Sequence, residues 1–462
     1  MKSCAPLLIP LAAPWITHAE TTEQQPPNII FVFIDDMGWK DAGFMGSTYY
    51  ETPRIDRLAS EGMMFTQAYA NAPNCAPSRA CLMSGTYSPR HSIYTVGNPA
   101  RGQDNLRKLI PAPRKESLDL DIVTMAEALK PAGYINGMFG KWHLGKDEEH
   151  SPLRQGFDVC IMKPEEKIKN DPKHMGFLTD SACAFMETNK TKSFFLYLAH
   201  HAVHLPIQAK TETIEKYNKK QGRPERIHPE YAAMVEDTDT CVGRLLDKID
   251  KLGLRENTMV VFFSDNGGHD AVTSMTPLRG SKGQLYEGGI RVPLIVRWPG
   301  KVRPGSSCDT PVIGTDFFPT FLKVAGTPTP SGKILDGVSL LPLLTQTGEL
   351  KPRALFWHFP VYLQGYTERQ GAFRTRPVGA VRMGDWKLLE YFEDGRLELY
   401  NLKDDIGETI NLAEKMPEET KELHRIMQNW RKHVNAFMPT EKNPDYDPNA
   451  TYIPPEKERN VK

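Results

Sequence analysis

The sequence predicts an α/β fold, with a doubly wound, mostly parallel central sheet flanked by helices and a smaller C-terminal antiparallel sheet with a helix. Continuous apolar runs rich in β-branched and aromatic residues occur at 28–34, 193–199 and 257–263. Such runs are typical of strands that are buried on both faces of a parallel sheet. Segments with helical spacing separate them, and this alternation indicates strand-helix-strand units.

The helices around the large sheet are expected at 54–61, 121–130 and 230–252. The second of these is stopped by Pro131, which cannot continue a helix. A further apolar segment, 134–140, follows it and leads into a polar stretch.

After about residue 340 the pattern changes to short strand segments separated by Gly-Asp and Asp-Gly turns. These segments are 380–382, 386–389 and 397–400, and a terminal helix is expected at 414–437. We therefore expect a large α/β domain at 26–340 and a smaller α+β subdomain at 341–462.

The overall charge is balanced, because the 462 residues include 57 Lys and Arg and 57 Asp and Glu. There is no global basic field, so nucleic acid is not an expected partner. Residues 1–19 combine Lys2, an apolar stretch and a small-residue end at Ala19, which is typical of a secretory signal peptide. We expect a secreted or periplasmic protein without a membrane span, since the apolar stretch is too short to cross a bilayer.

Seven cysteines in a chain of this length do not indicate a disulfide scaffold. Cys4 would leave with the signal peptide, and Cys75 belongs to the motif described next. The remaining five allow at most two disulfides, and the sequence does not define their pairing. They are Cys81, Cys160, Cys183, Cys241 and Cys308.

The motif Cys75-Ala76-Pro77-Ser78-Arg79 is the expected centre of a site. Pro77 suits a first helical turn, which would put Cys75 at a helix N-terminus, where free N–H groups attract anions. Arg79 lies one turn further along and could meet the same anion. The alternative is an ordinary buried cysteine beside a turn.

Polar side chains also follow each expected strand, beginning with Asp35 and Asp36 after the first. Open α/β sheets bind ligands beyond the carboxyl ends of their strands, so these groups can converge. The others are Lys141 and His143, the stretch His200 to His204, Asp265 with Asn266, and Lys282. Each cluster alone is compatible with a solvated loop or a core residue. Oxygen ligands of this kind suit Ca²⁺ or Mg²⁺ rather than Zn²⁺.

Taken together, the motifs resemble the type I sulfatases of the alkaline-phosphatase-like superfamily over about 28–411. Asp-Asp after the first strand, Cys-x-Pro-Ser-Arg, Gly-Lys-Trp-His-Leu-Gly, His-x-Pro, Ser-Asp-Asn-Gly, Gly-x-Lys-Gly and Tyr-Glu-Gly-Gly occur in the family's order. The resemblance implies a sulfuric ester hydrolase whose Cys75 is converted to 3-oxoalanine (formylglycine). A formylglycine-generating or anaerobic sulfatase-maturing enzyme would be the partner in that step. In the mechanism that the resemblance implies, one hydroxyl of the hydrated aldehyde attacks sulfur and the sugar or aryl alkoxide leaves. The second hydroxyl is then deprotonated and expels sulfate, which regenerates the aldehyde.

The resemblance also implies roles for the site residues. One Ca²⁺ would be held by Asp35, Asp36, Asp265, Asn266 and an oxygen of the modified Cys75. Arg79 would hold the hydrated aldehyde, while Lys141 and Lys282 would bind sulfate oxygens. His204 is implied as the general acid for the leaving oxygen, and His143 as the base that triggers sulfate release.

The expected substrate is a sulfated saccharide attacked from its end, because the motif spellings are more similar to bacterial polysaccharide sulfatases than to lysosomal arylsulfatases. Residues that could reach it are Arg101, His201, His358, Arg374 and Arg376, although isolated residues of these types are often plain surface. Two other functions stay open: a phosphonate or phosphodiester hydrolase of the same superfamily, and a non-catalytic glycan-binding relative.

Overall fold

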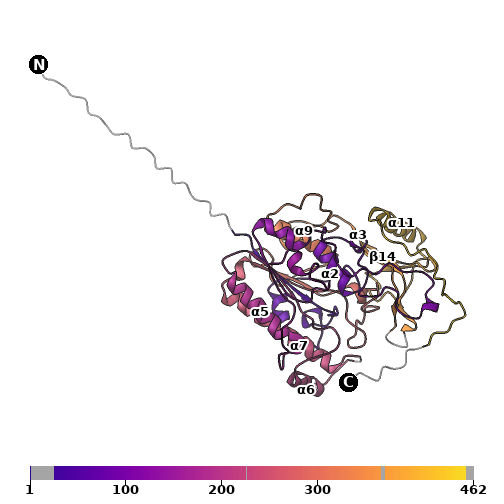
Figure 1. Ribbon diagram of the computed structural model, residues 1–462, viewed down its shortest axis with the longest axis horizontal. Coiled ribbons are helices and arrows are strands. Elements are labelled where there is room, and N and C mark those ends of the chain that lie inside the picture. Colours follow the sequence, from indigo (N-terminus) through magenta and orange to yellow (C-terminus); the bar gives the residue numbers. More distant parts are fainter. Residues whose placement is uncertain (2–24, 225, 366–369, 454–462) are drawn as a thin grey trace.

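The central sheet has eight strands in the order β5-β4-β6-β1-β7-β8-β2-β9 (Figure 1). The computed structural model describes residues 1, 25–224, 226–365 and 370–453. The strands are β1 Asn28–Ile34, β2 Met63–Phe65, β4 Ile135–Gly140, β5 Val159–Ile161, β6 Phe194–Ala199, β7 Thr258–Ser264, β8 Leu294–Arg297 and β9 Ser306–Cys308. All neighbours pair in parallel except β8, which is antiparallel to β7 and β2. The expected mostly parallel sheet is confirmed.

Helices cover both faces of this sheet. Phe31 and Phe33 of β1 point to the face covered by α2, α4 and α9, whereas Ile30 and Val32 point to the face covered by α1, α5 and α7. Figure 1 shows α2 and α9 on one side of the strands and α5 and α7 on the other. The helices are α1 Pro53–Ser60, α2 Cys75–Ser84, α4 Met125–Leu129, α5 Met175–Thr188, α6 Thr211–Lys219, α7 Pro229–Lys251 and α9 Phe317–Ala325. Strands buried on both faces explain why β6 and the interiors of β1 and β7 are apolar.

Some helix starts differ from the expectation, such as that of the terminal helix, which begins at Pro417 rather than at 414, and several helices were not expected. The segment 121–130 becomes helical only at Met125, because Thr124 and Glu127 form a capping box that fixes the start there. Helices α5, α6 and α9 have no counterpart in the sequence prediction.

A second, four-stranded sheet in the order β11-β14-β15-β16 is antiparallel throughout, as expected. Its strands are β11 Ala354–Phe359, β14 Val378–Met383, β15 Trp386–Tyr391 and β16 Leu397–Asn401. Helix α11, Pro417–His433, packs on it, with the ring of Trp430 stacked 4.5 Å from that of Phe356. Trp357 links this sheet to the rest of the molecule by donating its indole N–H to the carbonyl of Ala70.

Short elements complete the described fold. They are β3 Ala68–Tyr69, β10 Val312–Ile313, β12 Leu363–Gln364, β13 Phe373–Thr375, α3 Ser88–His91, α8 Glu287–Ile290 and α10 Leu341–Leu344. The expected signal peptide lies outside the described residues. Within the described ranges, no helix combines the length and apolar character needed to cross a bilayer. All described cysteines, from Cys75 to Cys308, are free thiols.

Candidate active site

The carboxyl ends of β1 and β7 bring four oxygen-bearing side chains together. Ile34 and Ser264 are paired in the parallel register, so the residues that follow them leave the sheet side by side. The backbone N–H of Asp36 donates to Asp265 Oδ1 at 3.1 Å, and Asn266 Nδ2 donates to Asp36 Oδ1 at 2.8 Å. Asp35 and Asp36 are both 1% exposed, so this edge carries buried carboxylates rather than solvated ones.

Strands β4 and β6 add cationic and imidazole groups to the same edge. Gly140 pairs with Ala199 at the ends of these strands, and the N–H of Lys141 donates to the Ala199 carbonyl. The side chain of Lys141 turns towards β1 and forms an ion pair with Asp35 at 2.5 Å. From the loop after β6, His204 Nε2 lies 3.6 Å from Asp36 Oδ2.

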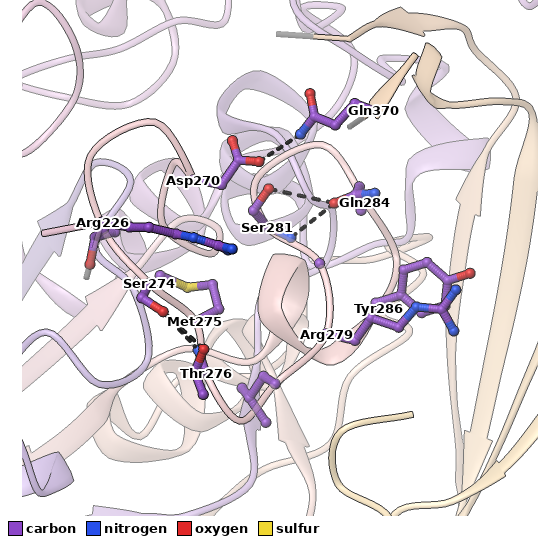
Figure 2. Close-up of a pocket in the computed structure, with 13 residues that line it drawn as sticks. Arg226, Asp270, Ser274, Met275, Thr276, Arg279, Ser281, Gln284, Tyr286 and Gln370 are labelled. Atoms are coloured by element: carbon purple, nitrogen blue, oxygen red, sulfur yellow. Dashed lines mark hydrogen bonds between the residues drawn. The ribbon is translucent and has the colours of Figure 1, made fainter. Parts of the chain in front are cut away.

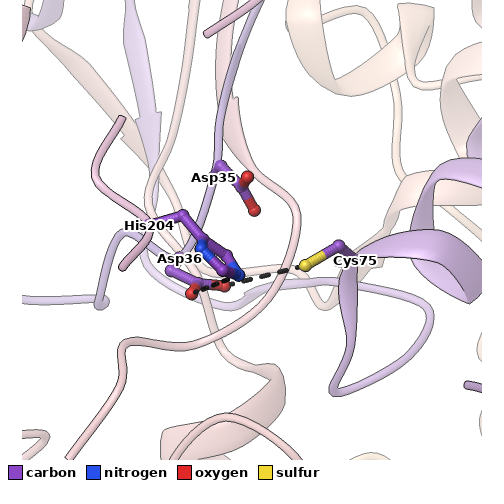
Figure 3. A group of neighbouring side chains, drawn as sticks. All are labelled: Asp35, Asp36, Cys75 and His204. Carbon is purple, nitrogen blue, oxygen red and sulfur yellow. Dashed lines mark hydrogen bonds and ion pairs between the residues drawn. The ribbon is translucent and has the colours of Figure 1, made fainter. Parts of the chain in front are cut away.

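Cys75 is the first residue of α2 and faces this cluster, as Figure 3 shows. Its Sγ lies 3.9 Å from Asp36 Oδ1, and one potential ligand atom each from Asp35, Asp36, Cys75 and His204 fall within 4.8 Å of one another. The sulfur therefore sits at a helix N-terminus and beside two carboxylates, with an imidazole on its open side.

Three cations surround the sulfur and the acids. Lys282 Nζ lies 3.4 Å from Cys75 Sγ and 2.6 Å from Asp36 Oδ1. The guanidinium of Arg79 is fully buried; its Nη2 lies 2.7 Å from Asp265 Oδ2, and its Nη1 donates to the Lys141 carbonyl. A charge-assisted network of this density holds its members in fixed positions, ready to bind an anion.

Two residues of the site hold strained backbone conformations. Asp36 has a φ of 65° and His143 a φ of 69°, both in the left-handed region that non-glycine residues seldom adopt. Each costs on the order of 1–3 kcal/mol, and such strain concentrates at functional sites. The strain aims the Asp36 carboxylate at Lys282 and Cys75.

The local charges shift three pKa values in different directions. Burial and Asp35 raise the pKa of the Cys75 thiol, but Lys141 and Lys282 outweigh them and hold it below its usual value. Burial opposes protonation of His204, but Asp36 and Asp35 raise its pKa to about 9. Burial, followed by Lys141, lowers the pKa of His143 to about 3. The two imidazoles thus lie in opposite electrostatic surroundings, His204 beside two carboxylates and His143 buried beside a lysine.

The oxygen atoms fit a hard divalent cation. Asp35 Oδ1 and Asn266 Oδ1 are buried and have no hydrogen-bond partner among the described residues. Leaving such atoms unpaired costs free energy, whereas a bound cation would satisfy both. Together with the carboxylates of Asp36 and Asp265 they form an oxygen-rich set of the kind that Ca²⁺ prefers.

The structure brings together every residue expected to act in catalysis or metal binding. Their contacts with one another are those given above, except for His143, which lines a small cavity with Ala76 and Thr95. Its Nδ1 is buried without a hydrogen-bond partner among the described residues. His143 therefore shares a cavity wall with Ala76, the residue that follows Cys75 in the chain.

The residues expected to contact substrate are scattered. His201 lies at the end of β6, with Nε2 3.2 Å from the Met162 carbonyl. Arg101 donates to Thr95 on the cavity next to His143. Arg374 lies beside the loop that carries Lys282, since a Cβ on Gly283 would meet its Nε at 2.7 Å.

The position of His358 does not support the expected contact with substrate. Its ring is buried among Tyr94, Phe392 and Trp430, and its Nε2 lies 2.7 Å from the Phe437 carbonyl. The side chain packs the C-terminal sheet against the chain after α11. Arg376, by contrast, is half-exposed and paired with Glu393.

Two residues near the site were not expected from the sequence. His269 is 7% exposed, and burial lowers its pKa to about 4, with the charges of Asp36 and Lys282 also acting on it. The sequence could have indicated that His269 lies near the site, because this residue directly follows the motif Ser-Asp-Asn-Gly-Gly. Lys173 lies just before α5, and the charges of Asp35 and Lys141 act on its ammonium. It does not follow a predicted strand, so the sequence pattern gave no reason to place it near the site.

Two family models match the chain. The family model described as Sulfatase matches residues 27–327, and the model described as N-sulphoglucosamine sulphohydrolase, C-terminal, matches residues 281–434. A protein named Sulfatase from Formosa agariphila is 34% identical, over 91% of this chain and 91% of that protein. N-acetylgalactosamine-6-sulfatase from Mus musculus is 33% identical, over 72% of this chain and 69% of its own length.

A solved structure with the same fold is Ps i-CgsB in complex with k-i-k-neocarrahexaose. It superposes with a TM-score of 0.74 at 29% identity, over 90% of this chain and 95% of that chain. The fold, the sequence matches and the cluster of acids, lysines and cysteine all indicate the same family of proteins.

Proposed function

The chain belongs to the sulfatase family, and from this premise we propose that it removes sulfate from a sulfated carbohydrate. The observation that carries the proposal is the place of Cys75, at the start of α2 with Lys282 Nζ 3.4 Å from its sulfur. A group in this position can attack the sulfur of a bound ester while the surrounding cations stabilise the added negative charge.

The carbohydrate part of the proposal is supported by relatives. N-acetylgalactosamine-6-sulfatase is named for a sugar substrate, and Ps i-CgsB was crystallised with k-i-k-neocarrahexaose. Cavities lined by polar and charged side chains adjoin the loop that carries Lys282, which suits a sugar better than a hydrophobic ligand.

We propose that Cys75 matures to formylglycine, through a separate maturing enzyme, and that Ca²⁺ is held by the oxygen atoms of Asp35, Asp36, Asp265 and Asn266. When present, the hydrated aldehyde supplies a hydroxyl nucleophile and the ion polarises a sulfate oxygen. The fit rests on the unpaired oxygens of Asp35 and Asn266 and on the burial of Cys75 among cations.

The protein's own side chains then bind the ester and move protons. Lys141 and Lys282 each carry an ammonium within reach of the anion, and both are already aligned by an aspartate. Arg79 binds Asp265 and the Lys141 carbonyl, and so it holds the residues that follow β7 and β4 in place. His204, whose side chain is partly exposed, is the proposed acid for the leaving sugar oxygen, and His143 is the proposed base.

We also propose secretion or a periplasmic location, on the pattern of residues 1–19. The division into a domain at 26–340 and a subdomain at 341–462 remains a proposal. The antiparallel sheet that begins at Ala354 is compatible with it.

The function is tested by assaying matured protein on matched sulfate and phosphate monoesters of the same sugars, with the Cys75 peptide examined by mass spectrometry. A sulfatase gives the higher kcat/KM on the sulfate esters, and its Cys75 peptide carries an aldehyde. A preference for phosphate, or for a phosphonate monoester, would favour the other hydrolase class. Tight binding of sulfated sugars without turnover, by protein in which Cys75 is matured, would favour a binding protein.

A further inference from the structure

A strongly basic cavity of about 300 Å³ lies between the Lys282 loop and the C-terminal sheet. Its lining includes Arg279, Arg374, Arg376 and Arg396. Among the described residues that line it, none is acidic. Its size is at the lower end for ligand pockets, as expected for a single sugar unit.

Three of these arginines are held in place by aromatic rings. Arg279 lies 3.9 Å from the ring centre of Tyr286, Arg396 lies 4.1 Å from that of Tyr391, and Arg376 lies 5.4 Å from that of Phe373. Stacking leaves the edge of a guanidinium free to donate and fixes its orientation. Less conformational entropy is therefore lost when such a group binds an anion.

The positive charge exceeds the negative charge around the cavity. Arg396 is paired with Glu398 at 2.8 Å and Arg376 with Glu393 at 3.1 Å. Arg279 lies 4.0 Å from Glu398 and shares that acid with Arg396, so these three guanidinium groups face two carboxylates. Tyr286, Tyr400 and Tyr362 also donate to these two acids, which are nearly buried. An added anion would therefore meet a net positive field.

The cavity and the proposed active site are both bordered by the loop that carries Lys282. Gln284, two residues after Lys282, donates to the Arg374 carbonyl, and Thr375 donates to the Gly283 carbonyl. Gly283 in turn donates to Pro73, two residues before Cys75. The short loop 282–284 thus contributes both to the basic cavity and to the site around Cys75.

A second cavity of about 470 Å³, shown in Figure 2, adjoins the first. Both are lined by Arg279, Gln284, Tyr286 and Gln370, and in Figure 2 the Arg279 side chain lies against Tyr286 at the edge of the pocket. The two cavities provide room for a chain longer than one sugar.

We infer that this cavity is a second anion subsite, which binds a sulfate or carboxylate on a sugar unit next to the one that loses its sulfate. The inference rests on the proposed function, because it takes Cys75 as the reacting centre. The substrate is then an oligosaccharide with at least two anionic groups, and Arg376 and Arg396, each about half-exposed, contact the second of them.

The test compares pairs of sulfated oligosaccharides that differ by one anionic group. Binding is measured by calorimetry on protein from a host that leaves Cys75 as a thiol, so that no turnover occurs. One set of pairs adds a second sulfate and another adds a carboxylate. The wild-type protein should bind the more anionic member of at least one set about tenfold or more tightly, since a charged hydrogen bond contributes about 1.5–3 kcal/mol.

The variants Arg376→Gln and Arg396→Gln should lose most of this preference. The matured Arg396→Gln variant should hydrolyse 4-nitrophenyl sulfate at the wild-type rate, because that substrate carries no second anion. Arg425→Gln, which removes an equally exposed, ion-paired arginine from α11, is the control and should behave as wild type.

The outcomes separate the two proposals. Equal binding within every pair, or an unchanged preference in both arginine variants, overturns the subsite even if sulfate esters are hydrolysed. Failure of the matured wild type to hydrolyse any sulfate ester overturns the proposed function, while the binding comparison still tests the cavity.

Discussion

The ammonium of Lys282 lies 3.4 Å from the sulfur of Cys75, although 207 positions separate the two residues in the chain. The same ammonium is ion-paired with Asp36, which follows β1. Loops after four strands of the sheet, β1, β4, β6 and β7, and the start of α2 must therefore all be in place before the site exists. The predictions below follow from that shared geometry.

Replacing Cys75 by Ala should lower kcat on a sulfated sugar by at least about 10³-fold, because it removes the nucleophile. The fold should be retained, since Cys75 is a small side chain at a helix start. The control is Cys81→Ala in the same helix. Cys81 is equally buried, and its pKa is raised to about 12 by burial, so its thiol is inert. Full activity in the Cys75 variant would contradict the assignment.

Replacing His204 by Ala should reduce activity by an amount that depends on the leaving group. A sugar alkoxide needs a proton from the acid, whereas 4-nitrophenolate leaves readily without one. We expect a loss of about 10²–10⁴-fold on a sugar sulfate and a much smaller loss on 4-nitrophenyl sulfate. Steady-state kinetics on both substrates give the ratio. Equal losses would mean that His204 positions the ester instead of donating the proton.

Chelation should inactivate the matured enzyme, and added Ca²⁺ should restore activity and raise Tm by several degrees. A ligand at about 100 times its Kd stabilises a protein by about 2.7 kcal/mol. Asp35→Asn should lose most of this thermal response, because it weakens one of the unpaired oxygen ligands. Asp147→Asn, in an exposed acidic group, is the control. Undiminished activity after chelation, with no metal found by elemental analysis, would exclude a cation at this site.

Stability should depend on pH through Glu408, which is buried with Glu287 against the single ammonium of Lys387, at 2.8 and 2.9 Å. Burial opposes ionisation of Glu287, but Lys387 and Arg291 lower its pKa to about 2, whereas burial raises the pKa of Glu408 to about 7. Between pH 4.5 and 7 the native state keeps a proton that the unfolded chain releases. This contribution to the free energy of unfolding is present below pH 4.5 and is lost as the pH rises towards 7.

Glu408→Gln removes that titration. Relative to wild type, the variant should therefore gain stability between pH 5 and pH 8, on the order of 1–3 kcal/mol. Urea unfolding of both proteins at the two pH values measures the change. A constant difference between them would mean that Glu408 is already ionised at pH 5.

Much of the site was predictable because its residues follow strands whose pattern is strong. Strand β1 is apolar from Ile29 to Ile34, and Asp35 and Asp36 come directly after it, so both the strand and its acids could be predicted from the sequence. The start of α4 was less predictable. The capping box at Thr124 decides it, and the apolar spacing extends further back than the helix does.

Residues placed by tertiary contacts were the least predictable. His358 has the residue type of a ligand contact, but its ring fills a space between Tyr94, Phe392 and Trp430, which come from distant parts of the chain. The basic cavity has the same origin. Arg279 and Arg396 are more than 100 positions apart and meet only because the C-terminal sheet packs against the Lys282 loop.

The burial of Cys75 has a consequence for the order of events in biosynthesis. Its side chain is 1% exposed and enclosed by Lys282 and Asp36, so another enzyme could not surround it with its own active site once the domain has formed. The proposed maturation would therefore compete with folding in time, and it would have to act on a chain in which α2 has not yet docked. Slower folding would then widen the interval for modification, and a fast-folding variant would accumulate as a well-structured but inert protein.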